Sequence, residues 1–256
     1  MDDIKKLNLS GSPLLKNGGD NPLLTVFLYI LVGVVAAVLV FVSFVGLCGV
    51  NQNSMMPTLA DGDRVLVFKY PGSVQAGDIV TINTGERIQA RNKDGTVKTD
   101  KRGLPVIIDF ILIKRVVATG GDEIKFVLDL SESELPIGGD SSIPINTKVL
   151  LYRKPKGAAA FELVHEPYAR LMLYSSKDGN NNIISLFKKI PFDENGESLI
   201  KIPENYFYAM GDNRPNSNDS REYGAFSDNK INSKVFYHLK RGSLTEWFFK
   251  LIYSDL

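Results

Sequence analysis

Two residues, Ser54 and Lys114, are of types that can act together in nucleophilic catalysis. Ser54 lies in NSMMPTL at residues 53–59, although a serine near a proline is also common in an ordinary turn. Lys114 lies in FILIKRVVAT at residues 110–119, where strand alternation places it on an apolar face. Apolar surroundings lower the pKa of a lysine, and a neutral amine can take the proton of a serine hydroxyl. The alternative is a lysine at a sheet edge whose amine reaches water.

A third candidate element is MGDNRPNSNDSREYG at residues 210–224, which gathers many polar side chains. Such a stretch is either a solvated turn or a set of hydrogen-bonded residues that holds a site rigid. The two histidines, His165 and His238, stand in no motif, and Cys48 is the single cysteine. The sequence therefore predicts no intrachain disulfide, no metal site and no cofactor. Lys plus Arg (30) and Asp plus Glu (29) nearly balance, which argues against a nucleic-acid-binding protein.

Strands must position these residues, because the chain after residue 50 is mostly strand-like. Short runs rich in Val and Ile are bounded by Gly, Asp or Pro, as is typical of strands. The expected strands are residues 63–69, 77–83, 110–119, 123–129 and 148–154. Residues 84–104 predict a hairpin or loop, and residues 131–146 predict a loop. The predicted fold class is mainly β: an N-terminal transmembrane helix, then an antiparallel β-sheet catalytic body with an inserted β-rich subdomain.

A long apolar segment precedes this body. No charged residue lies between Asp20 and Asp61, and residues 23–50 are almost wholly apolar, whereas about 20 residues of helix cross a bilayer. A cleaved signal peptide would have a shorter apolar region, and a lipoprotein site at Cys48 would need a small residue in place of Leu47. The segment therefore predicts an uncleaved anchor in which Cys48 packs in the membrane. Lysines in the preceding tail favour a cytoplasmic N-terminus, which would put the body outside the cytoplasm.

Together these elements resemble the type I signal peptidases, also called leader peptidases. The resemblance runs from the anchor through SMMPTL (54–59), GDIV (77–80), IKRVV (113–117) and GDNRPNSNDSR (211–221), in the same order and spacing. It does not extend to residues 126–205. The resemblance implies a membrane-bound serine endopeptidase with a Ser–Lys dyad. Its partners would be the lipid bilayer and secretory preproteins with small-x-small cleavage sites, with no cofactor, metal or nucleic acid.

The resemblance also implies residue roles, with Ser54 as the nucleophile and Lys114 as the general base. Further side chains would support and line the site: Ser217 orienting Lys114, Asp219 paired with Arg221, Asp212 paired with Arg115, and Met55, Leu59 and Ile113 lining pockets for small residues. Many bacterial members carry a serine two residues before the nucleophile that helps form the oxyanion hole, and here that position is Gln52. The expected oxyanion donors are therefore the Ser54 backbone N–H and the Gln52 amide.

The predicted domain order follows from these assignments. It consists of a cytoplasmic tail (1–22), the anchor (23–50), a catalytic β-domain (51–125 and 206–243), an inserted subdomain (126–205) and a C-terminal amphipathic segment (244–256). That last segment is too short to span a bilayer, so it either lies at the membrane interface or docks on the body. The predicted location is the cell (inner) membrane, with a single-pass anchor and the catalytic domain on the extracytoplasmic side.

Two competing functions remain. A self-cleaving Ser–Lys protein of the repressor type would carry a DNA-binding domain, and this sequence has an anchor and no helix-turn-helix signal. The second alternative is a catalytically inactive, membrane-tethered relative that acts as a binding protein. Gln52 and Pro215, which replaces a commoner Asp, favour that alternative. The joint presence of Ser54, Lys114 and Ser217 argues against it.

Overall fold

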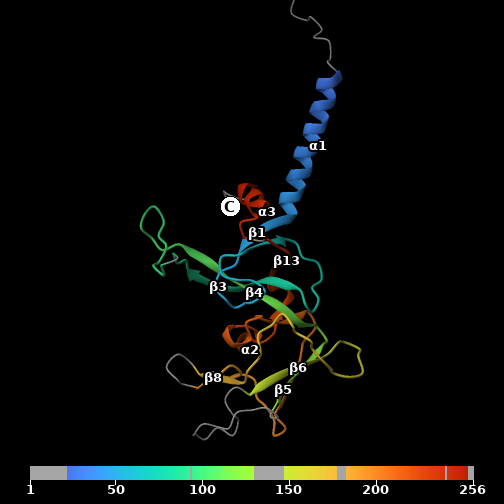
Figure 1. The fold of residues 1–256 in the computed structure, drawn as a ribbon, viewed down its shortest axis with the longest axis vertical. Coiled ribbons are helices and arrows are strands. Elements are labelled where there is room, and N and C mark those ends of the chain that lie inside the picture. Colours follow the sequence, from blue (N-terminus) through green and yellow to red (C-terminus); the bar gives the residue numbers. More distant parts are fainter. Residues whose placement is uncertain (1–21, 93, 130–146, 178–182, 240, 253–256) are drawn as a thin grey trace, which may run out of the picture. The chain divides into compact units, whose positions relative to one another are not determined.

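The structure is a computed structural model that describes residues 22–92, 94–129, 147–177, 183–239 and 241–252 (Figure 1). The loop predicted over residues 131–146 lies outside the described residues, as does all but the last residue of the tail predicted over 1–22. The chain divides into two units, Met1–Ser43 and Phe44–Leu256, and the second holds the strands.

The described part of the first unit consists of helix α1 (Pro22–Phe44), except for its last residue, Phe44, which belongs to the second unit. Its 23 residues carry no charge, and none of them is buried. At a rise of about 1.5 Å per residue the helix is about 34 Å long, which matches the hydrocarbon thickness of a bilayer. By length and composition, it is the one helix of the described chain that could cross a membrane.

The predicted anchor over residues 23–50 is too long, because the helix ends at Phe44. Val45–Gly49 form strand β1, which pairs antiparallel with β2 (Arg64–Phe68). A short apolar run has the same hydropathy in a buried strand as in a helix, so hydropathy does not mark this boundary. The expectation that Cys48 packs in the membrane is also wrong. Cys48 packs against the core of the body, and burial raises the pKa of its thiol.

The first sheet of the body has seven antiparallel strands in the order β1-β2-β13-β3-β4-β11-β12. Its remaining strands are β3 (Ile79–Gln89), β4 (Ile107–Thr119), β11 (Tyr206–Met210), β12 (Phe226–Ser227) and β13 (Ile231–Leu239). The strands predicted at 63–69, 77–83 and 110–119 correspond to β2, β3 and β4, and the last two extend as a hairpin into the predicted loop region. This order places β4 beside β11, which brings segments distant in sequence together.

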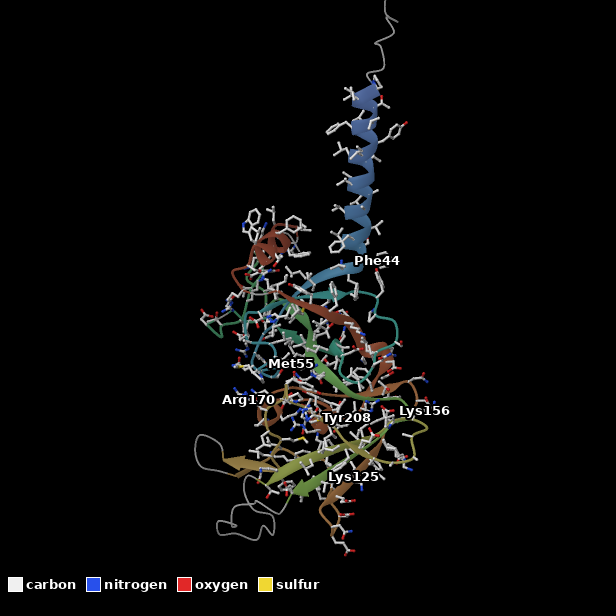
Figure 2. All side chains as sticks on the ribbon, turned by 45° about the vertical axis from the view of Figure 1, so that its right-hand side comes forward. Phe44, Met55, Lys125, Lys156, Arg170 and Tyr208 are labelled. Atoms are coloured by element: carbon white, nitrogen blue, oxygen red, sulfur yellow. The ribbon has the colours of Figure 1, made fainter. Side chains whose placement is uncertain are left out.

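The second sheet has four antiparallel strands in the order β10-β5-β6-β7. They are β5 (Glu123–Asp129), β6 (Lys148–Lys154), β7 (Glu162–Leu163) and β10 (Glu197–Lys201), and β8 (Ser175–Lys177) pairs separately with β9 (Ile183–Ser185). The strands predicted at 123–129 and 148–154 match β5 and β6. One hydrophobic core joins the two sheets, since Ala118 of β4 and Tyr208 of β11 pack with Phe126 of β5. Figure 2 shows Tyr208 between Met55 and Lys125 of β5. The predicted insertion therefore shares its core with the first sheet.

The turn between β4 and β5 links the two sheets. Asp122, which is buried, accepts hydrogen bonds from the Thr119 N–H (2.9 Å), Arg153 Nε (3.0 Å) and the Lys156 N–H (2.9 Å). Gly121 has a φ of +87°, a conformation that suits glycine. The buried aspartate therefore holds this turn together.

Short helices complete the body. They are η1 (Arg214–Asn216), α2 (Ser220–Tyr223), η2 (Asp228–Lys230) and α3 (Leu244–Ile252). The first two belong to the polar segment predicted as a candidate element. Helix α3 falls within the predicted C-terminal amphipathic segment and lies beside β1 (Figure 1).

Candidate active site

Ser54 lies in the turn that follows β1. Two backbone hydrogen bonds close the base of this turn, from the Val50 N–H to Asp63 O and from the Gly62 N–H to Val50 O, both at 2.8 Å. Asn213 holds its tip from the polar loop. The Asn213 N–H donates to Ser54 O at 3.0 Å, and its side-chain amide donates to the Asn53 carbonyl at 2.9 Å. The backbone around Ser54 is therefore fixed by a segment distant in sequence.

Lys114 projects from β4 into the interior. Leu112, Lys114 and Val116 are buried on one face of the strand, as the alternation predicted, and Lys114 is only 2% exposed. The sheet-edge alternative is wrong, because β4 lies between β3 and β11. Lys114 Nζ lies 2.8 Å from Ser54 Oγ and donates to the Ile113 carbonyl at 2.9 Å. The fold thus brings the two predicted residues into hydrogen-bond contact.

Burial sets the protonation of Lys114. Desolvation is the largest influence and lowers the pKa of Lys114 from 10.5 to about 8. The carboxylates of Asp219 and Asp212 oppose this shift, and the guanidinium of Arg221 adds to it. A lysine with this pKa has a substantial neutral fraction near physiological pH and can accept a proton.

Two buried ion pairs flank this lysine, and the resemblance implied both. Asp219 binds Arg221 through Nε and Nη2, each at 2.9 Å. Burial is the largest influence on the Asp219 carboxyl and opposes its ionisation, but the ion pair with Arg221 outweighs it, so the pKa is lowered. Asp212 binds Arg115 through Nε at 2.9 Å and Nη2 at 2.6 Å. Because both carboxylates are fully buried, the charges near Lys114 are fixed in place.

Ser217 does not make the hydrogen bond to Lys114 that the resemblance implies. In the part of the chain that the structure describes, its buried Oγ has no hydrogen-bond partner, although it lies close enough to Asp219 to help lower the pKa of that carboxyl. Gly211 separates Ser217 from the Ser54 turn. A Cβ at Gly211 would overlap with Ser217 Oγ and the Ser54 carbonyl oxygen, so this close approach requires glycine.

Residues 166–170 brace the polar loop, and sequence reasoning missed them. Both carboxylate oxygens of Glu166 accept from the guanidinium of Arg214, which is fully buried and donates through Nε to Gly211 O at 2.9 Å. The ring of Tyr168 lies 3.9 Å from Arg115 Cζ, and the Arg170 N–H donates to Asp212 O at 2.8 Å. The sequence held no signal for these contacts, because residues 126–205 match no motif.

Thr58 makes a further contact that the sequence did not predict. Its hydroxyl donates a hydrogen bond to Asp212 Oδ2. It ties the segment that carries Ser54 to the Asp212–Arg115 pair. The turn and the polar loop are therefore joined through both Thr58 and Asn213.

The residues expected to contact substrate are placed differently from one another. Met55 and Leu59 are fully buried in one hydrophobic cluster, and Ile113 packs against that cluster but is only half-buried. Gln52 is exposed, with a φ of +72°, and its backbone N–H donates to Asp61 at 2.7 Å. Within the described residues the Ser54 N–H donates to no acceptor, so it is available as an oxyanion donor.

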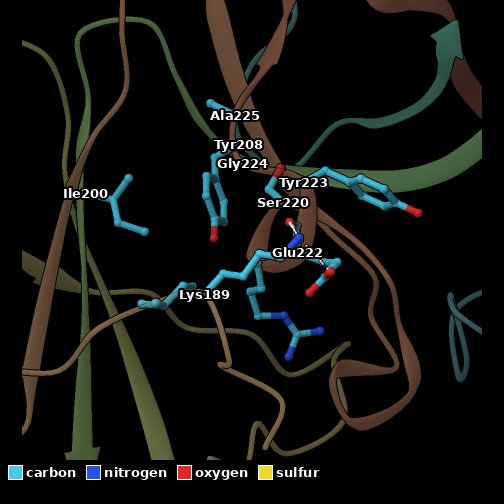
Figure 3. A pocket seen from close by; sticks show the side chains of 10 residues that line it. Lys189, Ile200, Tyr208, Ser220, Glu222, Tyr223, Gly224 and Ala225 are labelled. Atoms are coloured by element: carbon cyan, nitrogen blue, oxygen red, sulfur yellow. Dashed lines mark hydrogen bonds and ion pairs between the residues drawn. The ribbon is translucent and has the colours of Figure 1, made fainter.

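A hollow of about 320 Å³ lies beside α2 and is a separate feature (Figure 3). Lys189, Tyr208 and Arg221 are among its lining residues, whereas Ser54 and Lys114 are not. Tyr208 Oη and Arg221 Nη1 are buried without a hydrogen-bond partner among the described residues. The hollow is therefore not where Ser54 would meet a substrate.

The chain is similar to known proteins over most of its length. A profile of the family described as "Signal peptidase, peptidase S26" matches residues 23–239. Signal peptidase I of Aquifex aeolicus is 29% identical over 227 residues, which cover 75% of each chain. Signal peptidase I of Buchnera aphidicola is 26% identical over 224 residues, 73% of this chain and 67% of the other. Signal peptidase I S of Bacillus subtilis is 28% identical over 196 residues, 73% of this chain and 74% of the other. The chain belongs to peptidase family S26, the signal peptidases.

Proposed function

We propose that this chain is a membrane-anchored endopeptidase that removes N-terminal signal peptides from exported preproteins with a Ser54–Lys114 dyad. The observation that carries the proposal is the 2.8 Å contact between Lys114 Nζ and Ser54 Oγ, made in a site where burial lowers the pKa of the lysine to about 8. Family membership supports the substrate class.

In the proposed mechanism, neutral Lys114 takes the hydroxyl proton as Ser54 Oγ attacks the scissile carbonyl carbon. The tetrahedral intermediate collapses when Lys114 passes that proton to the leaving amine, which departs as the new N-terminus of the mature protein. The signal peptide remains as an ester on Ser54. Lys114 then takes a proton from water, the resulting hydroxide attacks the ester, and the proton returns to Ser54. One amine thus does the work of the His–Asp pair in a serine-protease triad.

Charge on the oxyanion would be stabilised by the Ser54 N–H, with the exposed Gln52 amide as the second donor. Loss of one such donor costs about 10²–10³ in rate, so Gln52 would matter if it replaces the family's serine. The two ion pairs would keep the polar loop fixed. Ser217 would orient Lys114 once its hydroxyl, which lacks a partner among the described residues, turns toward the amine.

Substrate contacts follow from the same geometry. Small side chains of a small-x-small site would pack on the exposed part of Ile113, with Met55 and Leu59 supporting it from the core. Helix α1 would hold the body at the bilayer, in a single-pass arrangement with the body on the extracytoplasmic side of the cell membrane. A signal peptide in the same bilayer would then meet Ser54 close to the membrane surface.

The test is cleavage of a preprotein with an Ala-x-Ala site by the purified chain in lipid. Wild type should cut at that site, whereas Ser54→Ala and Lys114→Ala should be inactive. Matched controls are Ser233→Ala and Lys234→Ala on β13, where the serine bonds Thr81 and the lysine pairs with Asp78. Both should retain activity.

Each other outcome has a definite meaning. Folded wild type that cuts nothing would support the inactive relative. Cleavage that survives Lys114→Ala would keep the peptidase and remove the proposed base.

A further inference from the structure

Helix α3 exposes a continuous apolar face. Leu244, Trp247, Phe248 and Leu251 are spaced i, i+3, i+4, i+7, which places them on one side of the helix. They are 80%, 61%, 51% and 63% exposed. An aromatic, aliphatic face of this size on a protein surface marks an interaction site.

Side-chain contacts at the N-terminus and on the polar side stabilise helix α3, which holds the apolar face in place. Ser243 Oγ accepts from the Glu246 N–H at 3.1 Å, and Glu246 Oε2 accepts from the Gly242 N–H at 2.7 Å, which caps the N-terminus. Lys250 pairs with Glu246 at 2.6 Å on the polar side. The helix therefore carries no net charge, since this pair holds its only ionised side chains.

The position of α3 follows from its contacts within the body. Phe249 packs against the hydrophobic cluster that Val45, Leu66 and Leu239 form. Val45 is bonded directly to Phe44, the last residue of α1. Whatever the direction of α1, α3 packs on a cluster that includes Val45, the residue that directly follows the apolar span.

We propose that α3 is an interfacial membrane helix, which inserts its face of Leu244, Trp247, Phe248 and Leu251 into the outer part of the bilayer. Tryptophan is enriched at that depth, and an amphipathic helix binds there through its buried apolar area. Because α3 has no net charge, its binding needs no anionic lipid and depends little on salt. The family match ends at residue 239, so α3 lies outside the matched region. The inference rests on the proposed anchoring by α1 and is independent of the proposed catalysis.

The chain supplies its own probe, because Trp247 is its single tryptophan. The full chain is reconstituted in phosphatidylcholine vesicles with brominated acyl chains, and flotation first establishes that it is inserted. Trp247 fluorescence should then be quenched by the bromines, shielded from aqueous acrylamide and unaffected by salt. Leu244→Ser/Leu251→Ser should lose most of the quenching. The matched control is Leu163→Ser/Leu199→Ser on β7 and β10, where the leucines are 54% and 53% exposed, and it should keep the quenching.

Three results would overturn the idea in different ways. A chain that does not float binds the bilayer neither through α1 nor through α3, so this result overturns the anchoring and the insertion of α3 together. If the chain floats and its tryptophan is quenched by acrylamide but not by bromine, α3 lies in water. A tryptophan shielded from both quenchers is covered by protein and not by lipid: by a second copy of this chain if dilution in lipid removes the shielding, and by the body of its own chain if it does not.

Discussion

The protonation state of Lys114 makes the sharpest prediction for this site. With a pKa of about 8, about one tenth of the enzyme has a neutral Lys114 at pH 7, half at pH 8 and about nine tenths at pH 9. If the neutral amine is the base, kcat/KM should rise about tenfold from pH 7 to pH 9 and then level off. At the ordinary pKa of 10.5, the neutral fraction at pH 7 would be only about 3 in 10,000. Burial therefore raises the neutral fraction of Lys114 at pH 7 about 300-fold.

The assay is the initial rate of cleavage of a signal-peptide substrate in detergent between pH 6 and pH 10. The substrate should have no titratable group near the cleavage site, and circular dichroism should show a folded protein at each pH. A profile flat from pH 6 to 9 would remove Lys114 as the base. A midpoint near about 10 would mean that the amine is solvated, contrary to its burial.

The neighbouring carboxylates provide a second check on the same reasoning. Asp219 raises the pKa of Lys114 more than Asp212 does. Asp219→Asn should therefore move the ascending limb to lower pH, and Asp212→Asn should move it in the same direction by less. A shift of the ascending limb to higher pH in either variant would contradict the electrostatic account.

Two further predictions concern the framework of the site. The new Cβ in Gly211→Ala would overlap with the turn that carries Ser54, so kcat should fall by about 100-fold while the far-UV circular dichroism spectrum stays unchanged. The control is Gly72→Ala, which has open space around the new Cβ and should be fully active. Glu166→Gln leaves the buried guanidinium of Arg214 without its carboxylate, which costs about 3–5 kcal/mol and lowers Tm by roughly 6–20 °C. Glu204→Gln, in a mostly exposed pair worth at most about 1 kcal/mol, should change Tm by no more than about 4 °C. Equal effects of the two Gln variants on Tm, or an active Gly211→Ala, would show that the loop is not held as described.

Much of the fold was readable from local pattern. The strands at 123–129 and 148–154 were predicted with their observed bounds, because turns of Gly, Asp and Pro interrupt runs of β-branched residues there. The apolar face of Lys114 was predicted from alternation, since side chains on a strand alternate strictly. The end of α1 was not predicted, because hydropathy is the same for a membrane helix and for the buried strand β1 that continues it.

The sequence by itself determined which residues could do chemistry: Ser54 and Lys114 stand in motifs that resemble, in order and spacing, those of the type I signal peptidases. Only the tertiary structure decided whether they meet, since contact between them needs β4 to lie beside β11 and Asn213 to hold the Ser54 turn. It also decided the depressed pKa of Lys114 and the brace from Glu166. Burial and long-range ion pairs depend on which segments pack together, and no local pattern in the chain records that.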